Sequence, residues 1–356
     1  MNDSRTMTAW LMTAPNEPFE KRDLPLDSPV AGELTVQIAG CGVCHTDLSF
    51  LYHGVQTRAP LPLVLGHEIS GVVSEVGEGV DQDLVGKPVV VPAVLSCGEC
   101  ELCRAGERRI CRSQVMPGND RHGGFATHVN VPARYVCPVS DQVLARTELW
   151  ELAIVSDAVT TPFQAVKRSG LAEGELAVFI GAGGIGIHGV QIAAATGAKV
   201  IALDIDDAKL ATAKSAGAAA VINVCDMSPR DVKKAVKAEV GALGAPKMLW
   251  KIFETSGTKP GQENAVALLG FGSTLAVVGF TMDKIEMRLS NFMAFDAQAF
   301  GTWGCDPALY PEVLEWVADG KIEVGVYAEK RPLDEINEVF AAAHRGELQR
   351  RVVLVP

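Results

Sequence analysis

A glycine-rich turn in the middle of the chain constrains the fold more than any other segment. The residues before it, 176–180, are all apolar, which is typical of a strand buried on both faces of a parallel sheet. The turn, residues 181–186, reads Gly-Ala-Gly-Gly-Ile-Gly, and the Ala-rich stretch 187–196 predicts a helix. In such a turn the glycines allow a sharp bend, approach of a pyrophosphate and packing of helix on strand. The sequence therefore predicts a dinucleotide-binding Rossmann fold with phosphates at the helix N-terminus.

An acidic residue ends the next expected strand. Residues 199–203 form that strand, and Asp204 follows it, eighteen residues after Gly186. A carboxylate here can accept hydrogen bonds from both ribose hydroxyls of NAD and would repel the 2′-phosphate of NADP. The sequence therefore predicts NAD as the cofactor. The alternative is that Asp204 only caps the helix that follows.

The rest of the chain divides into two kinds of pattern. Strands and helices go on alternating to residue 278, which predicts a doubly wound parallel sheet: strands 220–222, 251–254 and 274–278, helices 229–240 and 261–269. Residues before about 155 instead show short β-branched runs between Gly and Pro, typical of a partly open barrel or sandwich: 34–38, 69–76 and 89–91. A tail returns to that β-rich domain: helices 311–318 and 333–344, strand 352–354. We therefore expect a β-rich domain from 1–160 and 303–356, and an NAD-binding domain from 161–302.

Composition excludes several classes of partner. The chain has 356 residues and a formal net charge of −11, which argues against nucleic acid as a partner. No run of eighteen apolar residues predicts a membrane span, and residues 1–5 lack a signal-peptide pattern, so we expect a cytoplasmic protein. In that reducing compartment the nine cysteines should be thiols or metal ligands.

Four of the cysteines stand close together. The spacing Cys97-x₂-Cys100-x₂-Cys103-x₇-Cys111 places four thiolates within fifteen residues, enough to close a tetrahedral zinc shell with no open position. A zinc ion held in this way would fold a lobe without doing chemistry. An iron–sulfur cluster is the alternative, but the seven-residue gap and the absence of a proline after Cys111 favour zinc.

A second metal site is suggested by Cys-Gly-Val-Cys-His-Thr-Asp at 41–47 and Gly-His-Glu at 66–68. A thiolate from Cys44 and an imidazole from His67 suit Zn²⁺. The alternative for this pair alone is a buried thiol and a core histidine.

Together these motifs resemble the zinc-dependent alcohol dehydrogenases of the medium-chain dehydrogenase/reductase family. The resemblance implies a GroES-like catalytic domain beside the Rossmann domain, and a second, catalytic zinc ion held by Cys44 and His67. The family's third ligand is a cysteine where this chain has Asp157. A carboxylate can replace it, although Glu68 or water could complete the shell instead. Cys41 is expected to pack in the core.

The resemblance also assigns roles around the zinc ion. Thr46 is expected to bond the substrate oxygen and start a proton relay, and Asp47 to orient His67. Many family members carry a relay histidine where this chain has Ser49; Ser49 or His53 is expected to pass the proton on. The residues expected to contact the dinucleotide are His45, Thr161, Gly181, Gly183, Gly184, Ile185, Gly186, Asp204 and Lys209.

The substrate is the least constrained property. Ala93 and Val94 stand where family members with small substrates often carry a bulky aromatic, which favours a large secondary alcohol. Around 157–164 the sequence resembles 6-hydroxycyclohex-1-ene-1-carbonyl-CoA dehydrogenases, which implies a ring alcohol carried on a CoA thioester and oxidised with NAD. A general NAD-dependent alcohol or polyol dehydrogenase is one alternative, and a non-enzymatic dinucleotide sensor is another. The resemblance further implies a homo-oligomer, with a tetramer favoured over a dimer.

Overall fold

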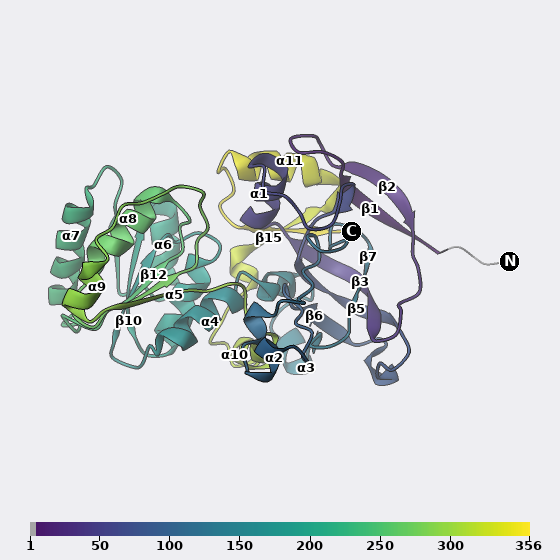
Figure 1. Cartoon of the computed structure of the whole chain (residues 1–356), viewed down its shortest axis with the longest axis horizontal. Coiled ribbons are helices and arrows are strands. Elements are labelled where there is room, and N and C mark those ends of the chain that lie inside the picture. The colour runs from purple at the N-terminus through teal and green to yellow at the C-terminus, as the bar shows by residue number, and fades with distance from the viewer. Residues whose placement is uncertain (1–4) are drawn as a thin grey trace. The chain divides into compact units, whose positions relative to one another are not determined.

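The computed structural model describes residues 5–356 and divides the chain into two compact units (Figure 1). Unit 1 runs to Thr160 and resumes at Gly304, and unit 2 is the continuous segment Thr161–Trp303. Of the first five residues, on which the absence of a signal peptide was judged, residues 1–4 lie outside the described part of the chain. No helix within 5–356 is long and apolar enough to cross a membrane.

Unit 2 is built on a six-stranded sheet in which every neighbouring pair is parallel. The strand order is β11-β10-β9-β12-β13-β14, so that β9 lies inside the sheet with a strand on each side. All five residues of β9 are buried, as its unbroken apolar run predicts. The strands are β9 (Leu176–Ile180), β10 (Lys199–Asp204), β11 (Ala220–Asn223), β12 (Lys251–Glu254), β13 (Thr274–Val277) and β14 (Gln298–Gly301).

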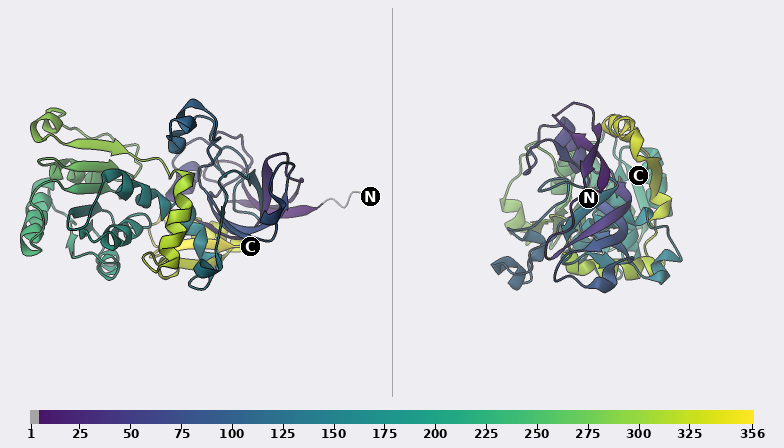
Figure 2. Two further views of the ribbon diagram at one scale, coloured as in Figure 1. Left: turned by 90° about the horizontal axis from the view of Figure 1, so that it is seen from below. Right: turned by 90° about the vertical axis from the view of Figure 1, so that its right-hand side faces the viewer.

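Helices connect these strands and cover the sheet (Figure 2). The connecting helices are α5 (Gly186–Ala195), α6 (Asp207–Ser215), α7 (Pro229–Ala242), α8 (Lys259–Leu268) and α9 (Ser290–Phe295), and α4 (Thr160–Ser169) precedes β9. Helix α5 contacts α6, and α7 contacts α8. Helices α5 and α6 lead along the sheet from β9 to β11, whereas α7 and α8 lead in the opposite direction from β11 to β13. Because crossovers between parallel strands are right-handed, the two pairs of helices cover opposite faces. This arrangement confirms the predicted doubly wound parallel sheet.

Unit 1 contains two mostly antiparallel sheets. The smaller sheet has the order β2-β1-β4, and the larger has the order β15-β16-β3-β5-β6-β8, with β7 also paired to β3. The strands are β1 (Thr6–Met12), β2 (Glu20–Pro25), β3 (Glu33–Gly42), β4 (Leu63–Val64), β5 (Glu68–Val76), β6 (Pro88–Val91), β7 (His128–Pro132), β8 (Cys137–Pro138), β15 (Ala328–Pro332) and β16 (Arg351–Val355). Short strands between turns agree with the β-rich pattern of the sequence.

The tail of the chain supplies the edge of the larger sheet. Strand β16 pairs antiparallel with β3, so that Val353 lies opposite Gly42 and Leu354 opposite Cys41. Its apolar residues enter the same core as β3 and β5. Segments far apart in the sequence therefore meet beside the motif at 41–47.

The helices of unit 1 are short. They are α1 (His45–Tyr52), α2 (Glu101–Arg104), α3 (Asp141–Leu144), α10 (Tyr310–Ala318) and α11 (Ile336–His344), with a 3-10 turn η3 (Glu151–Ser156) before Asp157. The sequence predicts a helix from residue 333, but α11 begins at Ile336. Leu333–Glu335 form a 3-10 turn instead, a tightening that is common at helix starts.

Candidate functional site

The four clustered cysteines face one another on a loop around α2. Their Sγ atoms are separated by 3.5 Å (Cys97–Cys111 and Cys100–Cys103), 3.7 Å (Cys100–Cys111) and 3.9 Å (Cys97–Cys103). A tetrahedron with Zn–S bonds of about 2.3 Å has S···S edges of about 3.8 Å. The four sulfurs therefore fit one zinc ion, and they stand too close together to enclose an iron–sulfur cluster.

Backbone N–H groups of the same loop point at the sulfurs. The N–H of Cys100 donates to Cys97 Sγ (3.3 Å), and the N–H of Cys97 donates to Cys111 Sγ (3.4 Å). A hydrogen bond from the Cys103 backbone lowers the pKa of Cys100 to about 6, whereas burial raises the pKa of Cys103 to about 12. N–H donors around thiolates are the surroundings that a bound metal requires.

A second group of metal-ligating side chains lies on the other motif. Donor atoms of Cys44, His67, Glu68 and Asp157 all lie within 4.8 Å of one another. Asp157 Oδ2 is 3.7 Å from both Cys44 Sγ and His67 Nε2. The structure thus brings together the three residues expected to bind zinc and Glu68, the expected alternative to Asp157. We call these four residues the mixed-ligand cluster.

Different elements supply the members of the mixed-ligand cluster. Cys44 is the N-cap residue of α1, His67 comes directly before β5, and Asp157 follows η3. Cys44 and His67 are 4% and 1% exposed, so their donor atoms are screened from bulk water. A thiolate, an imidazole and a carboxylate are a donor set that zinc accepts, so these residues fit the ion.

Asp47 ties the two halves of the motif together. Its carboxylate accepts the backbone N–H of Cys44 (3.0 Å) and that of Gly66 (3.2 Å), and its Oδ1 lies 3.4 Å from His67 Nδ1. Burial lowers the pKa of His67, but the charges of Asp47 and Cys44 outweigh burial and hold that pKa well above its usual value. Because Asp47 faces Nδ1, the other ring nitrogen is left toward Cys44 and Asp157, as a zinc ligand needs.

Arg351 is a residue of the site that the sequence did not reveal. It pairs with both oxygens of Glu68, and both side chains are buried. Burial raises the pKa of Glu68, and the charge of Arg351 only partly offsets this. Burial lowers the pKa of Arg351, but the charge of Glu68 outweighs burial and holds that pKa above its usual value. Removing one member of such a pair costs about 3–5 kcal/mol. Residues 68 and 351 are 283 positions apart, so no local pattern could have linked them.

The relay residues lie on α1. Thr46 Oγ1 is 3.7 Å from Cys44 Sγ, beside the mixed-ligand cluster. The hydroxyl of Ser49 donates to the carbonyl of His45 (2.9 Å), and the exposed ring of His53 lies 5.6 Å from that of His344. Thr46 is therefore placed to meet an atom bound at the cluster, whereas Ser49 bonds to the helix backbone. Cys41 is buried.

The glycine-rich turn in unit 2 has the features that a dinucleotide requires. A Cβ on Gly186 would collide with the carbonyl oxygen of Gly181, so only glycine lets α5 pack this closely on β9. At Gly183 a Cβ would meet nothing within 4 Å, so the space above this peptide is open. Gly183 thus leaves room for a phosphate group to approach the backbone.

Asp204 lies at the end of β10 and reaches back to that turn. Its Oδ2 accepts the N–H of Ala182 (2.7 Å), and its Oδ1 accepts the N–H groups of Ile205 and Asp206. The N-cap of α6 is Asp206, which accepts the N–H groups of Ala208 and Lys209. The alternative in which Asp204 only caps α6 is therefore wrong. Thr161 lies on α4 and is 5% exposed.

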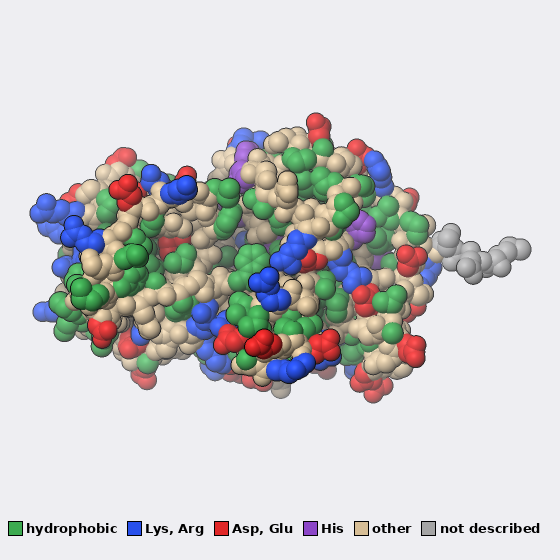
Figure 3. Space-filling view, viewed as in Figure 1, with side chains coloured by type: hydrophobic (Ala, Val, Ile, Leu, Met, Phe, Trp, Pro, Cys, Tyr) green, Lys and Arg blue, Asp and Glu red, His purple; other side chains and the backbone are tan. Residues whose placement is uncertain are grey.

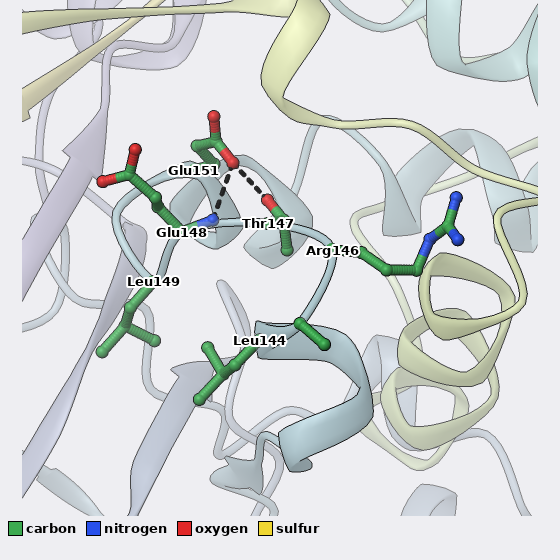
Figure 4. A pocket seen from close by; sticks show the side chains of 7 residues that line it. Leu144, Arg146, Thr147, Glu148, Leu149 and Glu151 are labelled. Atoms are coloured by element: carbon green, nitrogen blue, oxygen red, sulfur yellow. Dashed lines mark hydrogen bonds between the residues drawn. The ribbon is translucent and has the colours of Figure 1, made fainter.

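A separate hollow in unit 1, about 570 Å³ in volume, is lined by residues 144–149 and Glu151 (Figure 4). Inside it the carboxylate of Glu151 accepts the hydroxyl of Thr147 and the N–H of Glu148, the latter at 2.8 Å. None of the predicted site residues lines this hollow, and both of its glutamates are already hydrogen-bonded.

The sequence matches two known families of domains. Residues 30–141 match the alcohol dehydrogenase GroES-like domain, and residues 184–319 match the zinc-binding dehydrogenase domain. The first match contains Cys44, His67 and the four clustered cysteines, and the second begins inside the glycine-rich turn, at Gly184.

Known proteins align over nearly the whole chain. An alcohol dehydrogenase of Geobacillus stearothermophilus is 32% identical over 98% of this chain and 99% of its own length. A 2-dehydro-3-deoxy-L-galactonate 5-dehydrogenase of Pseudoalteromonas atlantica is 30% identical over 88% of this chain and 89% of its own. Among solved structures, the alcohol dehydrogenase of Aeropyrum pernix superposes with a TM-score of 0.86 at 28% identity, covering 98% of this chain and 100% of its own.

Proposed function

Because the chain belongs to the family of zinc-dependent alcohol dehydrogenases, we propose that it oxidises a secondary alcohol with NAD⁺ at the mixed-ligand cluster. Membership of the family makes it an oxidoreductase that uses zinc and a nicotinamide dinucleotide. The dinucleotide-sensor alternative is set aside, because the two relatives described above, which align over 98% and 88% of this chain, are enzymes by name. The observation that carries the proposal is the approach of Cys44, His67 and Asp157 to within bonding reach of one ion.

Each residue of the cluster has a separate task in this proposal. Cys44, His67 and Asp157 would hold the catalytic zinc ion, and the four clustered cysteines would hold a structural one. The catalytic ion supplies a Lewis acid for the substrate oxygen. Thr46 accepts and passes on the hydroxyl proton of the substrate, and Asp47 keeps His67 in the tautomer that leaves Nε2 free to bind. Glu68 is paired with Arg351, so in this proposal Glu68 lies beside the ion and does not bind it. The ion then has three protein ligands.

The proposal specifies NAD⁺ over NADP⁺ because of Asp204. A carboxylate at the end of β10, beside the glycine-rich turn, repels a 2′-phosphate. Replacing Asp204 by Ala should lower the ratio of kcat/KM for NAD⁺ to that for NADP⁺ by about tenfold or more. Asp207→Ala, a neighbouring acidic residue on α6, is the control. A wild-type enzyme that prefers NADP⁺ would contradict the assignment.

For the substrate we propose an alicyclic alcohol, 6-hydroxycyclohex-1-ene-1-carbonyl-CoA, which would become the 6-oxo enone. Support comes from the sequence resemblance around Asp157 and from the small side chains of Ala93 and Val94. The backbone N–H of Ala93 lies 3.4 Å from the carbonyl of Ser156, next to Asp157, so residue 93 lies near the cluster. NADH formation should be measured with this thioester, cyclohexanol, benzyl alcohol and ethanol. Turnover of ethanol or benzyl alcohol without turnover of the thioester would refute the substrate and leave the family intact.

A polyol or sugar-acid substrate is the second candidate. It is supported by the similarity to the 2-dehydro-3-deoxy-L-galactonate 5-dehydrogenase, whose name describes oxidation of a secondary hydroxyl on a sugar acid. The same assay extended to sugar acids and hexitols separates the two candidates. The higher kcat/KM identifies the substrate class.

We also propose that the protein is a homo-oligomer, a tetramer in preference to a dimer. In unit 2 large apolar side chains are exposed near the edge strand β14: Phe280 (65%), Met282 (75%), Leu289 (72%) and Met293 (78%). Figure 3 shows hydrophobic side chains gathered over α9 on the face that it draws. Such a patch favours association with another protein surface. Light scattering of the purified protein measures the mass, and a monomer would refute the proposal.

A further inference from the structure

The residue before Asp157 is tied to β5 by its side chain. Ser156 is fully buried, and its hydroxyl bonds in both directions to the backbone of Ile69. The N–H of Ile69 donates to Ser156 Oγ (3.1 Å), and Ser156 Oγ donates to the carbonyl of Ile69 (3.0 Å). Ile69 comes two residues after His67. Ser156 therefore makes a pair of bonds like that of a neighbouring strand, and it joins the segment carrying Asp157 to the strand that follows His67.

A second set of bonds holds the carbonyl of Ser156. The hydroxyl of Tyr310 donates to it, as does the hydroxyl of Thr160 (3.2 Å), and the N–H of Ala93 approaches to 3.4 Å. The N–H of Ala93 also donates to the oxygen of Tyr310 (3.1 Å). Tyr310 is completely buried at the start of α10, so this donor comes from the tail of the chain. A carbonyl oxygen has two lone pairs, and these donors saturate it.

We propose that Ser156 and Tyr310 are positioning residues that hold the carboxylate of Asp157 in place for zinc, an inference that rests on the proposed role of Asp157 as a ligand. Hydrogen bonds to the carbonyl of Ser156 anchor the peptide that joins Ser156 to Asp157. Hydrogen bonds of the Ser156 hydroxyl anchor the same residue to Ile69. Asp157 has φ −141° and ψ −58° and lies in the turn between η3 and α4, outside helix and strand. Because the backbone on the N-terminal side of Asp157 is fixed, mainly χ1 and χ2 of Asp157 remain to place its Oδ2 atom. That atom lies 3.7 Å from Cys44 Sγ and from His67 Nε2.

The carboxylate makes this support more necessary than a thiolate would. An aspartate has two rotatable bonds between its backbone and its ligand atom, whereas a cysteine has one. The same ligand position therefore requires more restraint elsewhere. The hydroxyl of Ser156 bonds to the backbone of Ile69, and that of Tyr310 donates to the carbonyl of Ser156, so both act on the cluster through the backbone beside Asp157.

The test measures zinc affinity at the mixed-ligand cluster in Tyr310→Phe and Ser156→Ala. Each substitution removes a hydroxyl and keeps the rest of the side chain. We expect the dissociation constant of this zinc ion to rise by about tenfold in each variant, because loss of a supporting group costs about 10–100-fold in metal affinity. The four-cysteine zinc should stay bound. Competition with a chromophoric chelator gives the constant, and the absorption spectrum of the cobalt-substituted enzyme reports the ligand geometry.

Ser70→Ala is the matched control. Ser70 is also fully buried on β5, and its hydroxyl donates to the carbonyl of Leu149 (2.6 Å), eight residues before Asp157. It should lose similar thermal stability and keep its zinc affinity and cobalt spectrum. A loss of zinc in Ser70→Ala as large as in Ser156→Ala would show general loosening and overturn the inference.

The effect should also depend on Asp157. In an Asp157→Ala background, Tyr310→Phe should change the zinc dissociation constant less than twofold, because residues that act through a third residue are not additive. An equal effect in both backgrounds would overturn the inference, as would wild-type affinity in both single variants. Asp157→Ala with undiminished zinc would instead contradict the ligand set itself, which separates the two failures.

Discussion

The two metal sites of unit 1 are built in opposite ways. The four cysteines lie within fifteen residues on one loop, and two of them lie on or beside the single helical turn α2. The mixed-ligand cluster takes Cys44, His67 and Asp157 from three separate elements, with 113 positions between the first and the last. The first site depends on local chain geometry, and the second depends on the completed fold. A metal can therefore organise the first site, whereas the fold must organise the second before the metal binds.

The groups that support the two metal sites also differ, because they are local at the first site and come from distant segments at the second. Around the four sulfurs the supporting groups are backbone N–H donors of the loop itself. Around the mixed-ligand cluster the supporting groups are buried side chains: Asp47, Arg351, Ser156 and Tyr310. A closed shell of four ligands suits a structural ion, and a shell of three suits an ion that must bind substrate. The predictions below test this contrast.

The largest expected effect follows from Asp157→Ala. We expect the zinc content to fall from two ions to about one per chain, and kcat/KM to fall by more than about a hundredfold. Elemental analysis and steady-state kinetics measure both quantities. Asp83→Ala, an exposed acidic residue of the same unit, is the control. Two zinc ions retained in Asp157→Ala would give the third position to Glu68 or to water.

Cys103→Ser should produce the reverse pattern. Cys103 is a buried member of the four-cysteine lobe, and a serine hydroxyl is a poor zinc ligand at neutral pH. We expect one zinc ion to remain, at the mixed-ligand cluster, with faster proteolysis between residues 97 and 116. Cys137→Ser is a matched control, because this cysteine is buried outside both sites. If both ions were lost together, the two sites would not be independent.

Chelation should separate the two ions in time. We expect the zinc of the three-ligand site to leave first, because an open position lets a chelator bind before the protein ligands dissociate. Activity should then disappear while about one zinc ion remains and the far-ultraviolet circular dichroism stays unchanged. Loss of the four-cysteine zinc before activity falls would reverse the assignment of catalytic and structural roles.

Asp47→Asn is expected to have the smallest effect. The amide keeps the size of Asp47 but removes the charge beside His67 Nδ1. We expect the zinc affinity to be about tenfold weaker at the mixed-ligand cluster and unchanged at the four-cysteine lobe. Competition with a chelator at fixed pH measures it. An unchanged affinity at both sites would show that Asp47 serves only to bond the backbone N–H groups of Cys44 and Gly66.

The sequence predicted well where a local pattern encodes the structure. The glycine-rich turn and its flanking strand and helix follow from residue type and spacing, because Gly186 must allow α5 to pack on β9. The four-cysteine site follows from spacing alone. The cap of α6 shows the limit: Asp204 and Asp206 are both acidic, and only the structure shows that Asp206 is the cap.

The parts that were missed depend on contacts between distant segments. Arg351 lies in a β-branched final strand with nothing in its neighbourhood to mark it as the partner of Glu68. Tyr310 meets Ser156 across 154 positions, and a tyrosine at a helix start has no pattern that separates it from a core residue. The predicted start of the last helix at residue 333 is a local error, because α11 begins at Ile336. The 3-10 turn that precedes it is not revealed by the apolar periodicity.

The pairing of β16 with β3 also sets an order of events during synthesis. Unit 2 is one continuous stretch, so it can fold as soon as it leaves the ribosome. Unit 1 cannot: Tyr310 and Arg351 emerge after all of unit 2 has been made. Until then the buried carboxylate of Glu68 has no guanidinium beside it. A nascent chain should therefore take up zinc at its four cysteines well before it can bind zinc at Cys44, His67 and Asp157.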